Sequence, residues 1–433
     1  MPGTASLIYG ESAPSARCIR VLVSRSSGRS RPSTTRWLWL LVAVAVLSQA
    51  AIHLIRPTTT YKLIDLGADG MTVGLVTALY SLLPVLFALA TASRAQRASS
   101  LRPLLLLGTA LMSLGAAGTA AAPHVAGIAA ASALLGVGQI VVVIAGQAAI
   151  ARFAGNDQLD FAFGWFTAGF AAGQMVGPLV AGAILDPAAG AAGATLAIDR
   201  TLWWGTSLTG IIAVLLLISG RTFHSHRRAD DSVLPSSQVP HQGGISHAVQ
   251  IIRTPRVKSH FFASIALIGM MDLLAAFLPL VGDEAGISPL WVGVLLAARA
   301  AASMLSRVLL PLLRRWFSRH VLVVTALWGA GSMLGASTSV TQYFPWALLT
   351  IALGGFFLGL GQPLTMSAIA EAVPLHCRSS ALALSLVGNR VGQVLVPMAA
   401  GGLTGVVGAS GGVWLGCLLL LGSGVEKTVF WKK

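Results

Sequence analysis

The chain has 433 residues, of which 55% are hydrophobic and 10% charged, and its formal net charge is +15. This composition excludes an ordinary soluble domain and indicates an integral membrane protein. The basic excess does not indicate a nucleic-acid binder, because Lys and Arg lie between apolar runs rather than on one folded face. We therefore expect the lipid bilayer, and no nucleic acid, as a partner. The three cysteines lie far apart and show no metal or disulfide spacing, so no metal and no cofactor are expected.

In chain order, residues 1–36 are rich in Ser, Arg and Pro and are expected to form a disordered cytoplasmic tail. No apolar run precedes Trp37, so no cleavable signal peptide is expected. Twelve apolar runs long enough to span a bilayer follow, at about 37–55, 73–91, 103–122, 125–150, 162–185, 201–219, 260–281, 290–310, 320–338, 344–369, 381–404 and 407–424. The stretch after the first run, 56–69, is expected to lie outside the membrane.

One segment occurs twice in the chain. Residues 169–182 read GFAAGQMVGPLVAG and residues 388–401 read GNRVGQVLVPMAAG, so equivalent residues lie 219 positions apart. The same offset relates VGLVTALY at 73–80 to VGVLLAAR at 292–299. A register held this long predicts two parallel copies of one unit, which is typical of transporters. The fold class is therefore predicted as an all-α membrane protein with 12 transmembrane helices in two parallel six-helix bundles.

These runs divide the chain into five parts. They are the tail at 1–36, an N-terminal six-helix bundle at 37–219, a polar cytoplasmic linker at 220–258, a C-terminal six-helix bundle at 259–424 and a cytoplasmic tail at 425–433.

The duplicated segment places small residues on one helix face. Glycines four positions apart share a stripe on which another helix can approach closely, and a proline loosens the preceding turn. We expect these residues to line a seam between moving parts, and they are Gly169, Gly173, Gly177, Pro178 and Gly182 with their counterparts Gly388, Gly392, Pro397 and Gly401.

The distribution of basic residues predicts the orientation. An even number of spans puts both chain ends on one side, and that side holds 23 of the 29 Lys and Arg. The other side holds Arg56, Lys62 and Arg200. The positive-inside rule then places both termini and the linker in the cytoplasm. We expect a multi-pass protein of a bacterial-type inner membrane, working as a monomer.

Ionisable side chains within a span are costly and are therefore candidate functional groups. Asp272 lies in the seventh run, Arg299 in the eighth, and Arg390 in the eleventh beside Asn389 and Gln393. Asp272 could bind and release a proton, or it could form a static pair with an arginine that fixes helix packing. The two arginines could hold a substrate carboxylate, or they could bond to backbone carbonyls or to Asp272.

Two further polar residues are candidates for the same site. His53 occupies the position that corresponds to Asp272 in the other copy and could titrate near neutral pH, or it could be a plain interfacial residue. Gln139 could line a cavity or bond between helices. No nucleophile with its base, phosphate loop or metal cluster is visible, so an enzyme is not expected.

The segment GQMVGPLVAG at 173–182 is similar to the fifth-helix antiporter motif GxxxGPxxGG of the major facilitator superfamily, with Ala181 in one glycine place. The chain resembles this family over about 37–424, and residues 56–69 resemble its drug-exporter-like members. The resemblance implies two parallel six-helix halves and leans toward proton-driven export. The loop after the second span departs from the family's GxxxDRxGRR pattern, since Arg97 stands at the Asp position. Ser132 stands where an arginine is expected on the fourth helix.

These features predict a secondary active transporter with a small-molecule substrate and protons as partners. Proton-coupled efflux of a drug or small organic molecule by alternating access is the first interpretation. Proton-coupled uptake of an organic anion is the alternative, suggested by Arg299 and Arg390. A transport-inactive membrane sensor or scaffold is a third, suggested by the altered loop after the second span.

Overall fold

A computed structural model describes residues 36–154, 158–186, 190–219, 222, 255–340, 343–373 and 378–430. The expected tail at 1–36, apart from Arg36, and most of the expected linker at 220–258 lie outside the described residues. The described residues form eleven helices: α1 (Arg36–Asp65), α2 (Gly70–Arg97), α3 (Arg102–Ala121), α4 (Val125–Phe153), α5 (Leu159–Leu185), α6 (Gly190–Ile218), α8 (Pro255–Glu284), α9 (Pro289–Trp316), α10 (Arg319–Ser339), α11 (Phe344–Glu371) and α12 (Arg378–Phe430).

The last of these, α12, contains two helices. Gly408 interrupts it with φ 72° and ψ 177°, a backbone conformation that glycine adopts without steric cost. Counting its parts, 378–407 and 409–430, the described residues provide twelve helices. All eleven labelled helices are long and apolar enough to cross a membrane. The predicted all-α class is therefore confirmed. The final helix continues to Phe430, beyond the predicted end at 424.

The predicted end of the first span was wrong. α1 does not stop near residue 55 but continues through Pro57 to Asp65. The polar side chains of this extension find acceptors on neighbouring helices: Arg56 bonds to Asp272, and Lys62 bonds to Asp199 and to the Ala120 carbonyl. Because these groups are satisfied inside the bundle, the chain has no need of water there.

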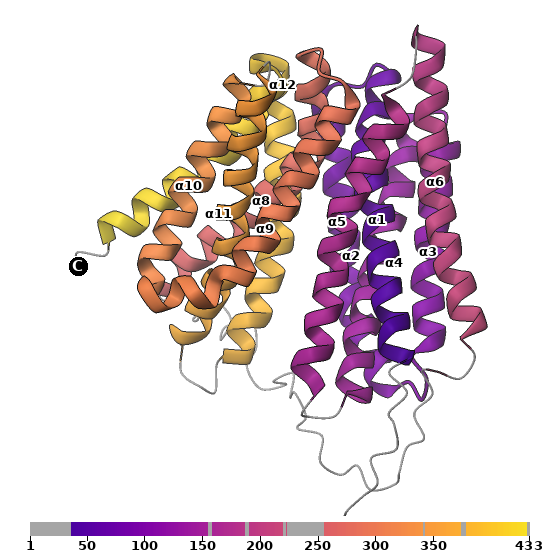
Figure 1. Cartoon of the computed structure of the whole chain (residues 1–433), viewed down its shortest axis with the longest axis horizontal. Coiled ribbons are helices and arrows are strands. Elements are labelled where there is room, and N and C mark those ends of the chain that lie inside the picture. Colours follow the sequence, from indigo (N-terminus) through magenta and orange to yellow (C-terminus); the bar gives the residue numbers. More distant parts are fainter. Residues whose placement is uncertain are drawn as a thin grey trace, which may run out of the picture. The chain divides into compact units, whose positions relative to one another are not determined.

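The first two helices of each copy have the same boundaries. The first and last residues of α8 lie 219 positions after those of α1, and the same relation holds between α9 and α2. Figure 1 shows α1 to α6, in indigo to magenta, lying together beside the orange and yellow helices α8 to α12. The repeat in the sequence is therefore a repeat of structure.

Two apolar clusters form the interior. One joins buried side chains of α1 to α6, and the other joins α8 to α12. The second cluster also takes in Leu63, Val73 and Val76 from the end of α1 and the start of α2. We call the membrane side where α1 ends the distal face, and the side where α1 begins the amino-terminal face. The two halves thus share apolar packing toward the distal face.

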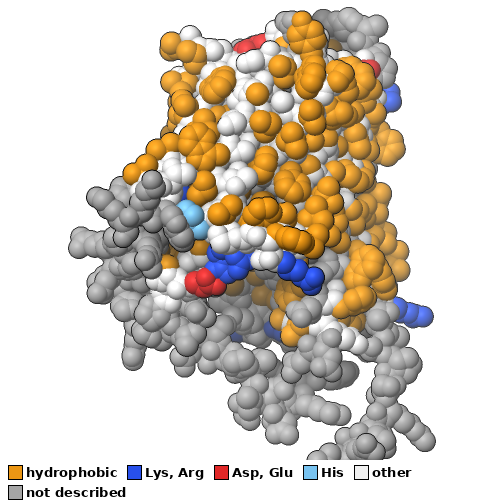
Figure 2. Space-filling model, turned by 60° about the vertical axis from the view of Figure 1, so that its left-hand side comes forward, with side chains coloured by type: hydrophobic (Ala, Val, Ile, Leu, Met, Phe, Trp, Pro, Cys, Tyr) orange, Lys and Arg blue, Asp and Glu red, His pale blue; other side chains and the backbone are white. Residues whose placement is uncertain are grey.

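The outer surface suits a bilayer. Many large apolar side chains are exposed, and Figure 2 shows them covering most of one face, above a band of charged side chains. A soluble protein rarely exposes apolar patches of this extent, whereas lipid tails require them.

Candidate functional site

A buried ion pair joins the two halves. The Nη1 atom of Arg56 on α1 lies 2.6 Å from Oδ1 of Asp272 on α8, and the two side chains are only 11% and 12% exposed. One turn further along, the Thr60 hydroxyl donates to the carbonyl of Ala276 at 3.0 Å. Asp272 therefore has an arginine partner, but it is Arg56, which had been expected outside the membrane.

An aromatic ring supports the guanidinium of Arg56. Its Cζ atom lies 4.6 Å from the centre of the Tyr80 ring on α2, a cation–π contact. The Tyr80 hydroxyl donates to Oε1 of Gln139 on α4. Gln139 thus acts through Tyr80, and helices α1, α2, α4 and α8 meet at one point.

Arg299 on α9 has bonding capacity left over. It is 4% exposed, and its Nε and Nη1 atoms have no hydrogen-bond partner among the described residues. It is close enough to Asp272 and Arg56 to interact electrostatically with both. Oδ2 of Asp272 and Nη2 of Arg56 are also buried without a partner among the residues described. A buried N–H without an acceptor costs free energy, so the guanidinium nitrogens mark a place where an acceptor fits, whereas Oδ2 of Asp272 calls for a donor.

The sequence repeat explains where His53 lies. His53 and Asp272 are 219 positions apart, as are Tyr80 and Arg299, so each pair occupies equivalent places in the two halves. His53 lies within α1, not near the end of the first span as expected, and its Nδ1 donates to the Gln49 carbonyl at 3.0 Å. It interacts electrostatically with Arg56, Arg299 and Asp272.

The polar patch on the first part of α12 is only partly joined to this cluster. Asn389 is 4% exposed and accepts a bond from the Ser264 hydroxyl of α8 at 2.8 Å. Arg390 donates to Oε1 of Gln393, one turn along the same helix, at 2.8 Å. Arg390 also interacts electrostatically with Tyr80, which places it at the edge of the cluster.

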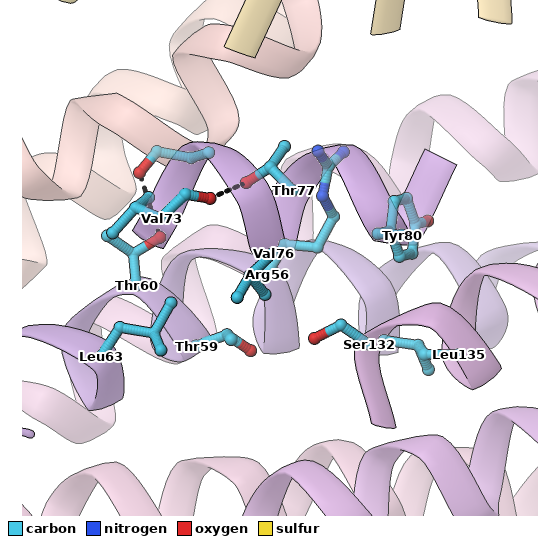
Figure 3. Close-up of a pocket in the computed structure, with 11 residues that line it drawn as sticks. Arg56, Thr59, Thr60, Leu63, Val73, Val76, Thr77, Tyr80, Ser132 and Leu135 are labelled. Carbon is cyan, nitrogen blue, oxygen red and sulfur yellow. Dashed lines mark hydrogen bonds between the residues drawn. The ribbon is translucent and has the colours of Figure 1, made fainter. Parts of the chain in front are cut away.

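A small pocket adjoins the ion pair. Figure 3 shows the Arg56 side chain reaching between Thr77 and Tyr80, with the hydroxyls of Thr59 and Ser132 facing one another below it. Ser132 is the position where the family resemblance led us to expect an arginine. The small serine leaves space there, and the guanidinium on this wall of the pocket comes from α1 instead.

Sequence reasoning missed Arg56 and Tyr80, although a signal for Arg56 was present. Shifted by the repeat offset, the seventh apolar run at 260–281 corresponds to 41–62, which includes Arg56. The first run was instead ended at residue 55, where polar residues begin. The same offset sets Tyr80 opposite Arg299, as it sets His53 opposite Asp272, so a signal for Tyr80 was present as well.

The glycine stripe of α5 faces its own half. A Cβ atom added at Gly173 would lie 2.7 Å from the Ala50 nitrogen of α1, and one at Gly177 would lie 2.6 Å from the Ala50 carbonyl. Gly169 similarly faces Val42. In the other half, a Cβ atom at Gly392 would lie 2.8 Å from the Ile265 carbonyl of α8, and Gly388 faces Phe261. These glycines let α5 pack on α1, and α12 on α8.

The last glycine of each segment faces the opposite half. A Cβ atom at Gly182 would lie 2.6 Å from the Pro289 carbonyl of α9, and one at Gly401 would lie 2.5 Å from the Gly70 carbonyl of α2. Gly182 corresponds to Gly401 and Pro289 to Gly70 by the repeat offset of 219 positions. The second contact is therefore the first contact with the two halves exchanged. A twofold relation between the halves produces this exchange.

The prolines repeat the same relation. A Cβ atom added at Gly293 would collide with the Pro178 carbonyl, and one added at Gly74 would lie 2.5 Å from the Pro397 carbonyl. All four contacts involve the distal ends of α2, α5 and α9 or the part of α12 before Gly408. The halves are therefore in close backbone contact toward the distal face.

Comparison with known proteins agrees with this architecture. The family model described as Major Facilitator Superfamily matches residues 38–327. No match was found among curated proteins. Solved structures with a similar fold include a POT family transporter in complex with a thioalcohol-conjugated peptide (13% identity, TM-score 0.70, covering 92% of this chain and 96% of that one). They also include the nucleoside transporter NupG (13% identity, TM-score 0.72, covering 92% of this chain and 99% of that one). A third is an inward-facing, occupied bacterial homologue of the human lysosomal transporter Spinster (14% identity, TM-score 0.67, covering 92% of this chain and 97% of that one).

Proposed function

Since the chain belongs to the Major Facilitator Superfamily and is a secondary transporter, we propose that it carries a small organic anion through a pathway lined by Arg56, Arg299 and Arg390. The observation that supports this most directly is Arg299, which is buried with two N–H donors that no described residue accepts. Arg56 is paired with the buried carboxylate of Asp272, Arg299 interacts electrostatically with it, and Arg390 interacts with Tyr80 at the edge of the same cluster. A carboxylate or phosphate on the substrate would satisfy the free donors in a bidentate manner.

Alternating access follows from the backbone contacts between the halves. The four glycine and proline contacts keep the distal ends together, so a substrate can leave on that side only when they separate. The ion pair of Arg56 and Asp272 also spans the two halves and must change as they rock. We infer that the described conformation is the one closed at the distal face.

Proton coupling is proposed for Asp272. Protonation of its carboxyl would remove the charge that holds Arg56 and would free that guanidinium for the substrate. Proton and anion would then travel together, which fits uptake. The test is Asp272→Asn in proteoliposomes with an imposed pH gradient: accumulation driven by the gradient should disappear while exchange of substrate across the membrane remains. Full gradient-driven accumulation in that variant would refute the role.

The substrate class can be tested without knowing the substrate. Purified protein is screened by thermal shift against matched compounds that differ in one group, for example benzoate with benzamide and succinate with succinamide. We expect stabilisation by some carboxylates and by none of their amides, and loss of that stabilisation in Arg299→Gln. Arg299→Lys keeps the charge but not the planar fork and should bind about tenfold or more weakly. Hits that are cationic or neutral, and unaffected by Arg299→Gln, would contradict an anionic substrate.

Proton-driven efflux of a drug or small molecule is the second candidate, and the similarity of residues 173–182 to an antiporter motif favours it. That motif, however, also has a packing explanation, because its counterpart on α12 makes equivalent contacts. Uptake assays in right-side-out and inverted vesicles separate the two directions. Absence of any coupled flux in a broad screen would favour the sensor or scaffold instead.

The same proposal includes location and form. We propose a monomer in a bacterial-type inner membrane with both termini in the cytoplasm, and with no covalent chemistry of its own. The basic residues support this orientation, and Arg56 and Lys62, first counted on the distal side, lie within α1. Protease accessibility of tags at either end in sealed vesicles tests it.

A further inference from the structure

A second cluster of basic side chains lies in the C-terminal half, away from the central pocket. It consists of Lys427 near the end of α12, His260 near the start of α8, and Arg319 and His320 at the start of α10, and we call it the basic corner. His260 interacts electrostatically with the other three, and His320 with Lys427. Three helix ends therefore bring these four side chains together at the amino-terminal face.

The basic corner has donors without acceptors. Lys427 is only 7% exposed, yet no hydrogen bond or ion pair within the described part of the chain takes up its ammonium group. The Nε atom of Arg319 and the Nδ1 atom of His260 are buried and lack partners among the described residues. Two acids are near: Glu371 pairs with Arg319, and Glu426 attracts Lys427 electrostatically. These leave the ammonium group of the largely buried Lys427 side chain without a hydrogen-bonded counter-ion among the described residues.

The fold does not require this cluster. By the repeat offset of 219 positions, His260 and Lys427 correspond to Leu41 and Leu208. In the N-terminal half both leucines belong to one apolar cluster, and Leu41 is completely buried. The same corner of the same bundle is thus filled with leucine in one half and with cationic or polar groups in the other. Packing alone therefore does not explain the polar groups of the basic corner.

The surroundings point to the membrane surface. The turn between α9 and α10 exposes Trp316 (79%) and Phe317 (50%), and aromatic side chains concentrate where lipid headgroups begin. Figure 1 shows the end of α12 leaning away from the other helices. Figure 2 shows a histidine, basic side chains and an acidic one gathered beneath the apolar surface. Basic pockets at this depth between helices suit phosphate headgroups.

We propose that the basic corner binds the phosphate group of an anionic phospholipid, with Lys427 as the main charge partner and His260 and Arg319 as additional donors. One lipid phosphate balances the charge of Lys427, while Arg319 remains paired with Glu371. The acyl chains would lie along the exposed apolar surface nearby. This site is independent of the transported substrate and of the central pocket.

The test uses the full chain, delipidated in detergent and examined by native mass spectrometry. Phosphatidylglycerol is titrated against the wild type, Lys427→Leu and Lys427→Arg, with zwitterionic phosphatidylcholine as the comparison lipid. We expect the tightest phosphatidylglycerol complex to weaken about five- to tenfold in Lys427→Leu and to persist in Lys427→Arg. His260→Leu should weaken it less. Both leucine substitutions copy the N-terminal half, and a melting curve in detergent checks that each variant is folded.

The matched control is Arg97→Leu, which removes an exposed cation at the end of α2 on the same face of the other half. It should leave the tightest complex unchanged. Equal affinity in Lys427→Leu, equal loss in Arg97→Leu, or equal binding of phosphatidylcholine would each overturn the proposal. A large excess of inorganic phosphate should not displace the lipid. Displacement would assign the corner to soluble phosphate and overturn its assignment to lipid.

Discussion

Replacing Asp272 by asparagine leaves the guanidinium of Arg56 buried in the bundle without its counter-ion. The wild-type pair is 2.6 Å apart with both side chains close to 90% buried. Removing one partner of such a pair costs about 3–5 kcal/mol, whereas removing both often costs little. Asp272→Asn should fall at the upper end of that range, because Arg299 would then face Arg56 with no acid between them.

The opposite substitution should cost less. In Arg56→Met the carboxylate of Asp272 keeps electrostatic attraction from Arg299, so we expect a loss of about 2 kcal/mol. The double variant should be within about 1–2 kcal/mol of wild type, which gives a coupling energy of about 5 kcal/mol. The assay is the free energy of unfolding of all four proteins by SDS titration in mixed micelles.

A matched control comes from another ion pair between helices. Lys62 and Asp199 are 3.1 Å apart, but the side chain of Asp199 is 43% exposed. Asp199→Asn should therefore lower the free energy of unfolding by about 1 kcal/mol or less. Two results would refute the reasoning: effects of the Arg56 and Asp272 substitutions that add within about 0.5 kcal/mol, or a cost for Asp272→Asn no larger than that for Asp199→Asn.

Two more predictions concern the distal face. Gly182→Ala would put a Cβ 2.6 Å from the Pro289 carbonyl, so it should penalise the distally closed state by about 1–3 kcal/mol and lengthen pulsed-EPR distances between labels on α5 and α9. The control is Gly164→Ala, because the space at its Cβ is open. Equal distance distributions in the two variants would count against close contact of the halves at Gly182. Bonds from the Thr72 hydroxyl and backbone N–H to the Asp69 carboxylate hold the pKa of Asp69 below its usual value, so this cap stabilises the fold above about pH 4 and loses that effect as pH falls through the lowered pKa. Asp69→Ala should cost about 1 kcal/mol at neutral pH and nothing in strong acid, measured by unfolding at several pH values; a cost independent of pH would contradict the cap.

The sequence alone was enough to establish the spans and their duplication. Long apolar runs have one stable solution in a bilayer, because a helix satisfies its own backbone. The repeat offset of 219 positions survives as identical boundaries for α1 with α8 and α2 with α9. The glycine segments could also be recognised as packing surfaces, since a stripe of residues four apart lies on one helix face. Asp272, Arg299 and Arg390 were identified as candidates because an ionisable group within a span is expensive, and His53 because it corresponds to Asp272 in the repeat.

Tertiary structure decided which of these groups meet. Because polar residues begin at Arg56, the sequence pattern predicts that the first span ends before it. In the structure Arg56 is buried, because Asp272 on α8 and the Tyr80 ring on α2 lie against its guanidinium. The stripe on α5 faces α1 at Gly173 and the other half only at Gly182, a division that depends on how the helices cross. A charged residue is tolerated inside a membrane protein according to what lies opposite it. That partner comes from a helix far along the chain, in the other half of the molecule, so no local pattern could reveal it.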